Sequence, residues 1–151
     1  MVSCSRNQEE VMPMNKMVLA RVSTARKQAD RKEDDFRYAV TGVSTHKHDS
    51  IEFSKGCDVL DYSIKTSHAS LPSTLKGETI ADKLADMYKR DAANKYVYIS
   101  DDNIAYIMNK CEFTAFVLAF GRLERDSQKN GGNMKVRILR ESTRMLAWLN
   151  A

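Results

Sequence analysis

The sequence lacks the features that would place it in a special class of protein. Its 151 residues include only two prolines, six glycines and three cysteines, which is typical of a globular chain and not of a disordered, collagenous or disulfide-rich one. It contains no apolar run of the roughly eighteen residues that a membrane span needs, and the polar start MVSCSRNQEE lacks the apolar region of a signal peptide. We therefore expect a cytoplasmic protein with no membrane partner.

The few cysteines do not form a zinc motif. Cys4, Cys57 and Cys111 are widely spaced, with no CxxC pair among them. We expect three reduced thiols. No internal repeat or Pro/Ser-rich linker divides the chain, and its length fits one domain with one core.

The order of hydrophobic patterns predicts an α/β fold with a mixed sheet and flanking helices. The first part of the chain alternates between helical and strand-like periodicity, which predicts a helix over about 9–34, strands over 36–44, 51–53 and 59–66, a helix over about 78–92 and a strand over 96–100. The remainder predicts a strand over 104–108, a helix opened by Asn109 with Glu112 as a capping box, a strand over 135–139 and a closing helix over 141–150.

Positive charge is concentrated near the C-terminus. The whole chain has a net charge of +4 and a pI near 9.0. Between Arg122 and Arg144, seven basic residues stand against three acidic ones. This excess predicts a basic surface for a polyanionic partner, although a solvated face of scattered charges is the alternative.

The strand over 59–66 carries a polar face that includes a lysine. In LDYSIK the side chains of Ser63 and Lys65 point to one face and the apolar side chains to the other. If the strand over 51–53 pairs with it as a hairpin, Asp49 lies beside Lys65, and Glu52 lies on the same face. Asp61 shares that face, but four residues of strand place it about 13 Å from Lys65.

This arrangement resembles the PD-(D/E)XK nuclease superfamily, also called restriction-endonuclease-like. The likeness depends on the order helix, three strands, helix, strand over about 9–100, with Asp49 opening the second strand and Lys65 ending the third. The resemblance implies an αβββαβ core, with residues 104–151 as a basic C-terminal extension. It also implies a metal-dependent endonuclease, of a kind carried by phages and mobile elements.

The resemblance assigns roles to named residues. Asp49 would bind Mg²⁺ or Mn²⁺, and Lys65 would act on the attacking water and the phosphate. The family's second acid falls on Ser63, a neutral hydroxyl that binds a hard cation weakly. Glu52 is the nearest carboxylate to replace it, with Glu33 as another choice. Asp58, near the hairpin turn and roughly 20 Å from Lys65 on a straight strand, stays a candidate only if the hairpin is built differently.

Two further segments predict contacts with nucleic acid. Ser67 follows the Lys65 strand in the loop TSHASLPS, whose hydroxyls and N–H groups suit phosphate oxygens. The stretch RDSQKNGGNMKVRI combines two glycines with polar and basic side chains, and its candidate phosphate ligands are Arg125, Lys129, Asn130, Lys135 and Arg137.

Other constellations are weaker. His46 and His48, with the more distant His68, could hold a transition metal, but no cysteine spacing supports them. A hydrolase based on Ser67, His68 and Ser70 lacks a nucleophile elbow. The Phe-rich segment 111–123 predicts a core helix, or else an interface for a protein partner or a second copy.

We therefore expect a metal-dependent endonuclease that hydrolyses DNA, with double-stranded DNA as the main partner. A homodimer would match a palindromic target. The alternative is a non-catalytic nucleic-acid-binding or inhibitory protein of a phage or mobile element, in which Ser63 marks a lost active site.

Overall fold

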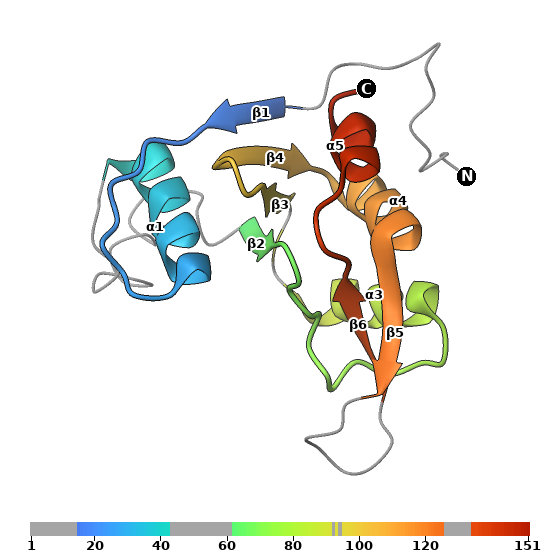
Figure 1. The fold of residues 1–151 in the computed structure, drawn as a ribbon. Coiled ribbons are helices and arrows are strands. Elements are labelled where there is room, and N and C mark those ends of the chain that lie inside the picture. The colour runs from blue at the N-terminus through green and yellow to red at the C-terminus, as the bar shows by residue number, and fades with distance from the viewer. Residues whose placement is uncertain (1–14, 43–61, 92, 94, 126–133) are drawn as a thin grey trace. The chain divides into compact units, whose positions relative to one another are not determined.

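The computed structural model describes residues 15–42, 62–91, 93, 95–125 and 134–151 (Figure 1). In chain order its elements are β1 (Asn15–Val18), α1 (Gln28–Thr41), β2 (Tyr62–Thr66), α3 (Ile80–Arg90), β3 (Lys95–Ile99), β4 (Ile104–Met108), α4 (Lys110–Phe120), β5 (Gly121–Arg125), β6 (Met134–Ile138) and α5 (Thr143–Leu149). The expected mixed α/β class is confirmed. Within these residues, no helix has the length and apolar character to cross a membrane.

The chain forms two compact units, each assembled from separate segments. The four-strand unit contains Met14–Thr66 and Ala93–Met108. The two-strand unit contains Met1–Pro13, Ser67–Ala92 and Asn109–Ala151.

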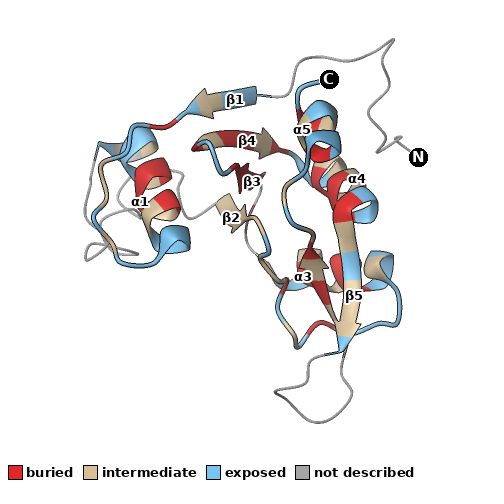
Figure 2. Cartoon of the chain, viewed as in Figure 1, coloured by how far each residue is buried: buried red, intermediate tan, exposed pale blue. Residues whose placement is uncertain are grey.

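The four-strand unit is built on a mixed sheet with the strand order β1-β4-β3-β2. β2 runs parallel to β3, with Lys65 opposite Tyr98, whereas the β1–β4 and β3–β4 pairs are antiparallel. The β-rich segments YVYI and IAYIM form β3 and β4 as expected, because β-branched and aromatic side chains fit a pleated and buried surface (Figure 2).

Helix α1 packs on one face of this sheet. Phe36 is fully buried together with Leu19, Val97, Ile99 and Ala105. Tyr62 and Ile64 of β2 pack against the same core, and the Phe36 and Tyr62 rings meet edge to face at 5.2 Å. Burial of this apolar surface is the main force that joins α1 to the sheet.

The expected helix over about 9–34 is confirmed only for residues 28–34, and the other elements expected before residue 44 are wrong where the structure describes them. Residues 15–18 form a strand and not a helix, and residues 36–41, expected as a strand, end α1. The alternation in FRYAVT fits a strand, but Lys32, Phe36 and Val40 are also four residues apart and share one helical face. Burial of Phe36 and the Arg37–Glu33 ion pair at 2.8 Å, an i, i+4 contact, favour the helix.

A buried polar network fixes α1 to the β3–β4 turn. Asp35 is 4% exposed, and its carboxylate accepts hydrogen bonds from the backbone N–H groups of Val22 and Ser23 and from the Asn103 side chain. Buried Lys32 donates to the Ser100 carbonyl at 2.8 Å. Because each buried charge is hydrogen-bonded, the network stabilises the turn without an unsatisfied ion.

The two-strand unit packs its helices around aromatic side chains. Phe113, Phe116 and Phe120 of α4 are buried, and the Phe116 and Phe120 rings lie 5.8 and 5.9 Å from the Trp148 ring of α5. The prediction that the Phe-rich segment packs a core is confirmed for these side chains. The Asn109 and Glu112 capping box that opens α4 is also confirmed.

Helix α4 ends earlier than the apolar run suggested, and a strand that the sequence did not predict follows it directly. Gly121 ends α4 and begins β5. A Cβ at Gly121 would lie 2.5 Å from the Val117 carbonyl oxygen, so only glycine fits this tight junction. On the same helix, Cys111 is disulfide-bonded, so the expectation of three reduced thiols is wrong; Cys4 and Cys57 lie outside the described residues.

Candidate nucleic-acid interface

The β5–β6 pair has one polar and one apolar face. Its antiparallel register places Arg122 opposite Arg137 and Glu124 opposite Lys135. Opposed residues of an antiparallel pair point to the same side, so these four charged side chains share a face. The other face carries Leu123 with the buried Val136 and Ile138 and joins the core.

The segment after β2 lies along the outer edge of β6. The Leu71 N–H donates to the Val136 carbonyl and the Ile138 N–H donates to the Ala69 carbonyl, both at 2.8 Å, and Ser70 bridges to Arg137. His68 therefore lies beside the polar face, in a left-handed conformation with φ 66°.

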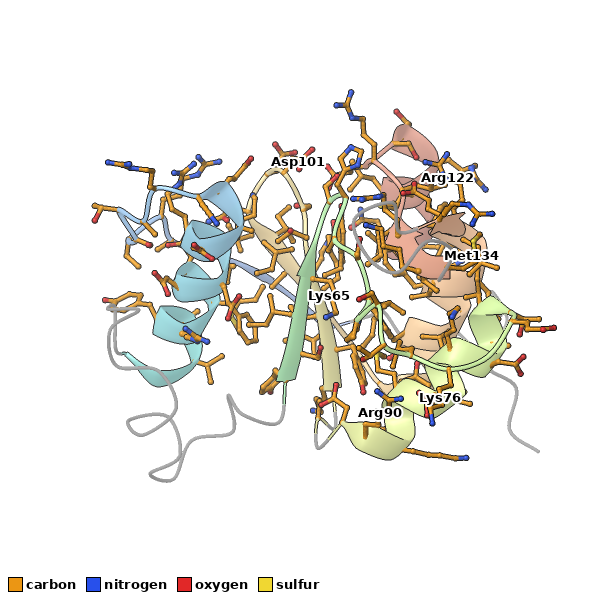
Figure 3. All side chains as sticks on the ribbon, turned by 90° about the horizontal axis from the view of Figure 1, so that it is seen from below. Lys65, Lys76, Arg90, Asp101, Arg122 and Met134 are labelled. Atoms are coloured by element: carbon orange, nitrogen blue, oxygen red, sulfur yellow. The ribbon has the colours of Figure 1, made fainter. Side chains whose placement is uncertain are left out.

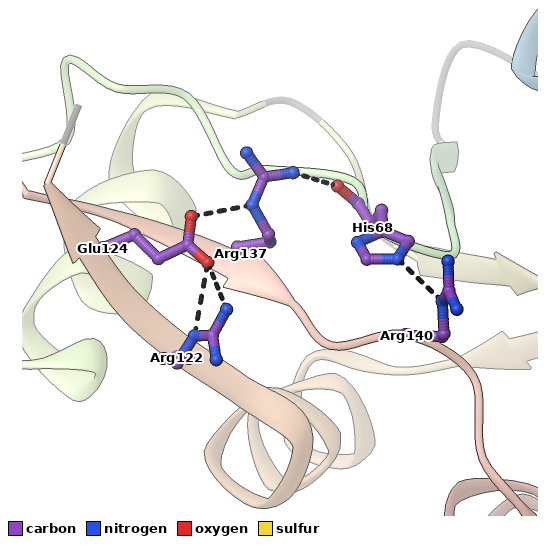
Figure 4. A network of polar contacts seen from close by, with 5 residues as sticks. All are labelled: His68, Arg122, Glu124, Arg137 and Arg140. Carbon is purple, nitrogen blue, oxygen red and sulfur yellow. Dashed lines mark hydrogen bonds and ion pairs between the residues drawn. The ribbon is translucent and has the colours of Figure 1, made fainter. Parts of the chain in front are cut away.

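A series of polar contacts links the β5–β6 pair to the segment that follows β2 (Figure 4). Glu124 accepts from Arg122 at 2.6 Å and from Arg137 at 2.8 Å. Arg137 also donates to the His68 carbonyl at 2.7 Å, and Arg140 Nε lies 3.3 Å from His68 Nε2. Nearby, the Ser67 hydroxyl accepts from the Glu141 N–H at 3.1 Å.

Glu124 is held as a carboxylate by its arginines. The hydrogen bond from Arg137, followed by that from Arg122, lowers the pKa of Glu124 from 4.5 to about 2, although desolvation opposes this shift. Glu124 therefore carries its full negative charge at neutral pH and orients both guanidinium groups.

The face remains basic after this pairing. Arg122, Lys135, Arg137 and Arg140 contribute four positive charges, and Glu124 and the adjacent Glu141 contribute two negative ones, which leaves a net +2 with His68 neutral. We refer to the four cations together as the basic face. Each guanidinium carries five N–H donors, and the contacts above use only part of them. A basic, donor-rich surface of this kind suits phosphate oxygens.

The structure brings together three of the six residues that the sequence predicted to bind nucleic acid. Lys135 and Arg137 share the basic face, and Ser67 lies at its edge. Arg125 is opposite Met134 and falls on the other side of the β5–β6 pair. Lys129 and Asn130 lie outside the described residues.

The predicted catalytic lysine lies in the four-strand unit. Ser63 and Lys65 are half-exposed on β2, on the face opposite the α1 core (Figure 3). Asp49, Glu52 and Asp58 lie outside the described residues, as do the expected strand over 51–53 and the hairpin that would bring Asp49 to Lys65.

The described residues do not by themselves fit a Mg²⁺ or Mn²⁺ site. On the Lys65 face of β2, Ser63 supplies a hydroxyl and Lys65 an amine, whereas these hard cations prefer carboxylate oxygens. In the part of the chain that the structure describes, no group of three histidine, cysteine or acidic side chains is placed to hold a metal. His46 and His48 fall outside that part, and His68 contacts Arg140.

The sequence did not single out four members of the interface as nucleic-acid contacts: Arg122, Glu124, His68 and Arg140. Arg122 and Arg140 were counted only within the basic segment predicted to meet a polyanion, and His68 was considered only as a metal ligand or as part of a hydrolase site. The alternation in GRLER would place Arg122 and Glu124 on one face of a strand. The apolar run before this segment instead suggested that it ends a helix. His68 and Arg140 are 72 residues apart, so only the fold brings them together.

Comparison of the chain with family models, with curated proteins and with solved structures finds no match. The functional assignment therefore depends on the site itself.

Proposed function

We propose that this protein binds the phosphate backbone of nucleic acid through the basic face of β5–β6, with double-stranded DNA as its main ligand. The observation that supports this proposal is the grouping of Arg122, Lys135 and Arg137 with Glu124 on one face of β5–β6, to which Arg140 is linked through His68. Phosphate contacts of this kind give affinity without reading the base sequence.

The central carboxylate favours binding by keeping the arginines in place. A free arginine side chain loses conformational entropy when it grips a ligand. Arg137 is only 28% exposed and is held by both Glu124 and the His68 carbonyl, so part of that entropy is lost already on folding. Arg122 is 62% exposed and reaches furthest into solvent.

Fluorescence anisotropy with a labelled DNA duplex tests the proposal. The observed association constant should fall steeply as salt rises, because bound cations are released from the DNA. Changing Arg122 and Lys135 together to alanine should weaken binding to all duplex sequences alike. It should also reduce the slope of log K against log salt by about two, roughly one for each phosphate that is no longer neutralised.

Arg125→Ala is the matched control, since it removes an arginine from the same strand but from the opposite face. It should leave the salt slope unchanged. Equal losses of affinity in Arg125→Ala and in the double variant would show a general charge effect and not this face, and a wild-type affinity that is independent of salt would contradict the proposal.

A second candidate function is metal-dependent hydrolysis of the bound DNA, within a restriction-endonuclease-like core. The observation that favours it is the position of Ser63 and Lys65: both are partly exposed and point away from the α1 core, beside the buried Tyr96 and Tyr98 of β3. The Lys65 amine would stabilise negative charge on a phosphate oxygen. The carboxylates for a metal would come from Asp49, Glu52 or Asp58. Without them, the protein would bind or block nucleic acid without cutting it.

A further inference from the structure

The two-strand unit contains a polar cavity separate from the residues of the basic face. Its volume is about 620 Å³, within the range of small-molecule sites. It is formed by the loop before α3, the first turn of α3 and the start of β6, and its lining residues are Ser73, Thr74, Leu75, Lys76, Gly77, Glu78, Lys83 and Met134. Figure 3 labels Lys76 and Met134.

Lys83 is the unusual member of this lining. Its side chain is buried, with 5% exposed, and its amine donates one hydrogen bond, to the Leu75 carbonyl at 3.1 Å. Within the described residues, no carboxylate lies in ion-pair range of this amine. A buried ammonium group is costly unless an anion compensates it, and its place in the first turn of a helix adds an unfavourable interaction with the helix dipole.

The loop that supplies most of the cavity is fixed to α3 by three side chains. Lys83 holds Leu75, Asp86 accepts the Lys76 N–H at 2.9 Å, and Arg90 contacts the hydroxyl and carbonyl oxygens of Thr74. Gly77 completes the loop in a left-handed conformation with φ 116°, where a Cβ would lie 2.3 Å from Asp82 Cβ. The cavity wall is therefore formed before any ligand binds.

The lining has the chemistry of a site for a phosphorylated ligand. Lys76 and Lys83 contribute two positive charges against the single negative charge of Glu78. Ser73 and Thr74 supply hydroxyl donors, and the Met134 thioether is a soft apolar surface of the kind that packs against aromatic rings. The volume exceeds what an inorganic phosphate ion alone would fill.

We infer that this cavity binds the terminal phosphate of a nucleotide, with the Lys83 amine as the main contact and Lys76 as the second. The phosphate would form the charge-assisted hydrogen bonds that Lys83 lacks within the protein. The ligand is either a free mononucleotide or the phosphorylated end of a nucleic-acid strand, since both present the same phosphomonoester. The inference does not depend on the basic face, because its lining residues are different.

Calorimetric titration of the full chain tests the inference. The probes are inorganic phosphate, a deoxynucleoside 5′-monophosphate and the same nucleoside without phosphate. The monophosphate should bind, and the nucleoside should not. Lys83→Met, which keeps an unbranched side chain and removes the amine, should weaken monophosphate binding about tenfold or more, the typical cost of losing a hydrogen bond to a charged group.

Lys89→Met is the control, because Lys89 is an exposed lysine on the same helix that does not line the cavity. It should bind the monophosphate as the wild type does, and so should Arg122→Ala, which separates this site from the basic face. Titration with a 5′-phosphorylated oligonucleotide and its 5′-hydroxyl counterpart then identifies the source of the phosphate.

Failure of wild-type protein to bind every phosphate probe overturns the inference, as does equal binding by wild type and a folded Lys83→Met variant. Should Lys83→Met not fold, Lys76→Met replaces it, because Lys76 is exposed and its loss does not disturb the core. Weakened monophosphate binding by Lys76→Met supports the site, and unchanged binding overturns it.

Discussion

At the scale of single residues, the carboxylate of Glu124 determines how the basic face is built. Without it, four cations would crowd one surface and repel one another. With it, two guanidinium groups are aligned at 2.6 and 2.8 Å. Like-charged side chains directly opposite each other destabilise a strand pair, and Arg122 is opposite Arg137. Glu124 therefore offsets a repulsion that the binding surface requires.

This role predicts a pH dependence. The folded pKa of Glu124, about 2, lies below the ordinary value of 4.5. The stabilisation is thus fully present above pH 4.5 and is lost as the pH falls from about 4.5 to 2. Glu124→Gln should lower the melting temperature at pH 7, and the difference from wild type should shrink across that acidic range.

Melting curves followed by circular dichroism at pH 7, 5, 4, 3 and 2.5 would measure this convergence. Glu112→Gln is a useful comparison, because Glu112 lies in a different network. A Glu124→Gln difference that stays constant from pH 7 to 2.5 would show that the carboxylate charge does not stabilise the face.

At the scale of elements, α4 illustrates a helix whose start is defined locally. The Asn109 side chain accepts from the Glu112 N–H at 2.7 Å, and the Glu112 side chain accepts from the Asn109 N–H at 2.9 Å. These two hydrogen bonds satisfy two backbone donors that a helix end otherwise leaves without partners.

Removal of this cap should destabilise the protein measurably. Asn109→Ala should cost about 1 kcal/mol in the free energy of unfolding, the typical value for an N-cap. Asn109→Ser retains a side-chain acceptor and should cost much less. Urea denaturation of both variants measures the difference, and equal stabilities for the alanine and serine variants would show that the cap contributes little.

The sequence correctly predicted the helices and strands whose formation depends on neighbouring residues. The cap of α4, the amphipathic pattern of α3 and the β-rich segments of β3 and β4 all depend on residues close in the chain. The C-terminal part of α1, residues 36–41, could not be distinguished from a strand, because Phe36, Tyr38 and Val40 alternate while Phe36 and Val40 also have helical spacing. The deciding interaction, the packing of Phe36 with Val97 and Ile99, is long-range.

The candidate site was predictable only in part, for the same physical reason. Lys135 and Arg137 alternate within one strand, so their shared face follows from strand geometry. The link from Arg137 to His68 crosses 69 residues. The cavity beside Lys83 likewise includes Met134 of β6, which only the fold brings to the loop before α3.

At the scale of the whole molecule, the two proposed activities belong to different units. The basic face and the cavity lie in the two-strand unit, whereas Ser63 and Lys65 lie in the four-strand unit. The chain passes between the units at four points: Pro13–Met14, Thr66–Ser67, Ala92–Ala93 and Met108–Asn109. Variants in the two-strand unit can therefore test binding, and variants in the four-strand unit can test hydrolysis.

The position of Lys65 outside the two-strand unit allows hydrolysis to be tested apart from binding. If the protein hydrolyses DNA, wild type should nick or linearise plasmid in buffer with Mg²⁺ or Mn²⁺, and Lys65→Ala should reduce the rate about a hundredfold or more, as expected when a group that stabilises transition-state charge is removed.

Lys95→Ala is the control, since Lys95 is exposed on β3 and in register with Tyr62, on the other side of the sheet from Lys65. Lys65→Ala should still bind duplex with the wild-type salt slope, because its basic face is intact. Plasmid that stays supercoiled with wild-type protein under both metals, together with salt-dependent binding, would remove hydrolysis and leave a protein that binds nucleic acid without cutting it.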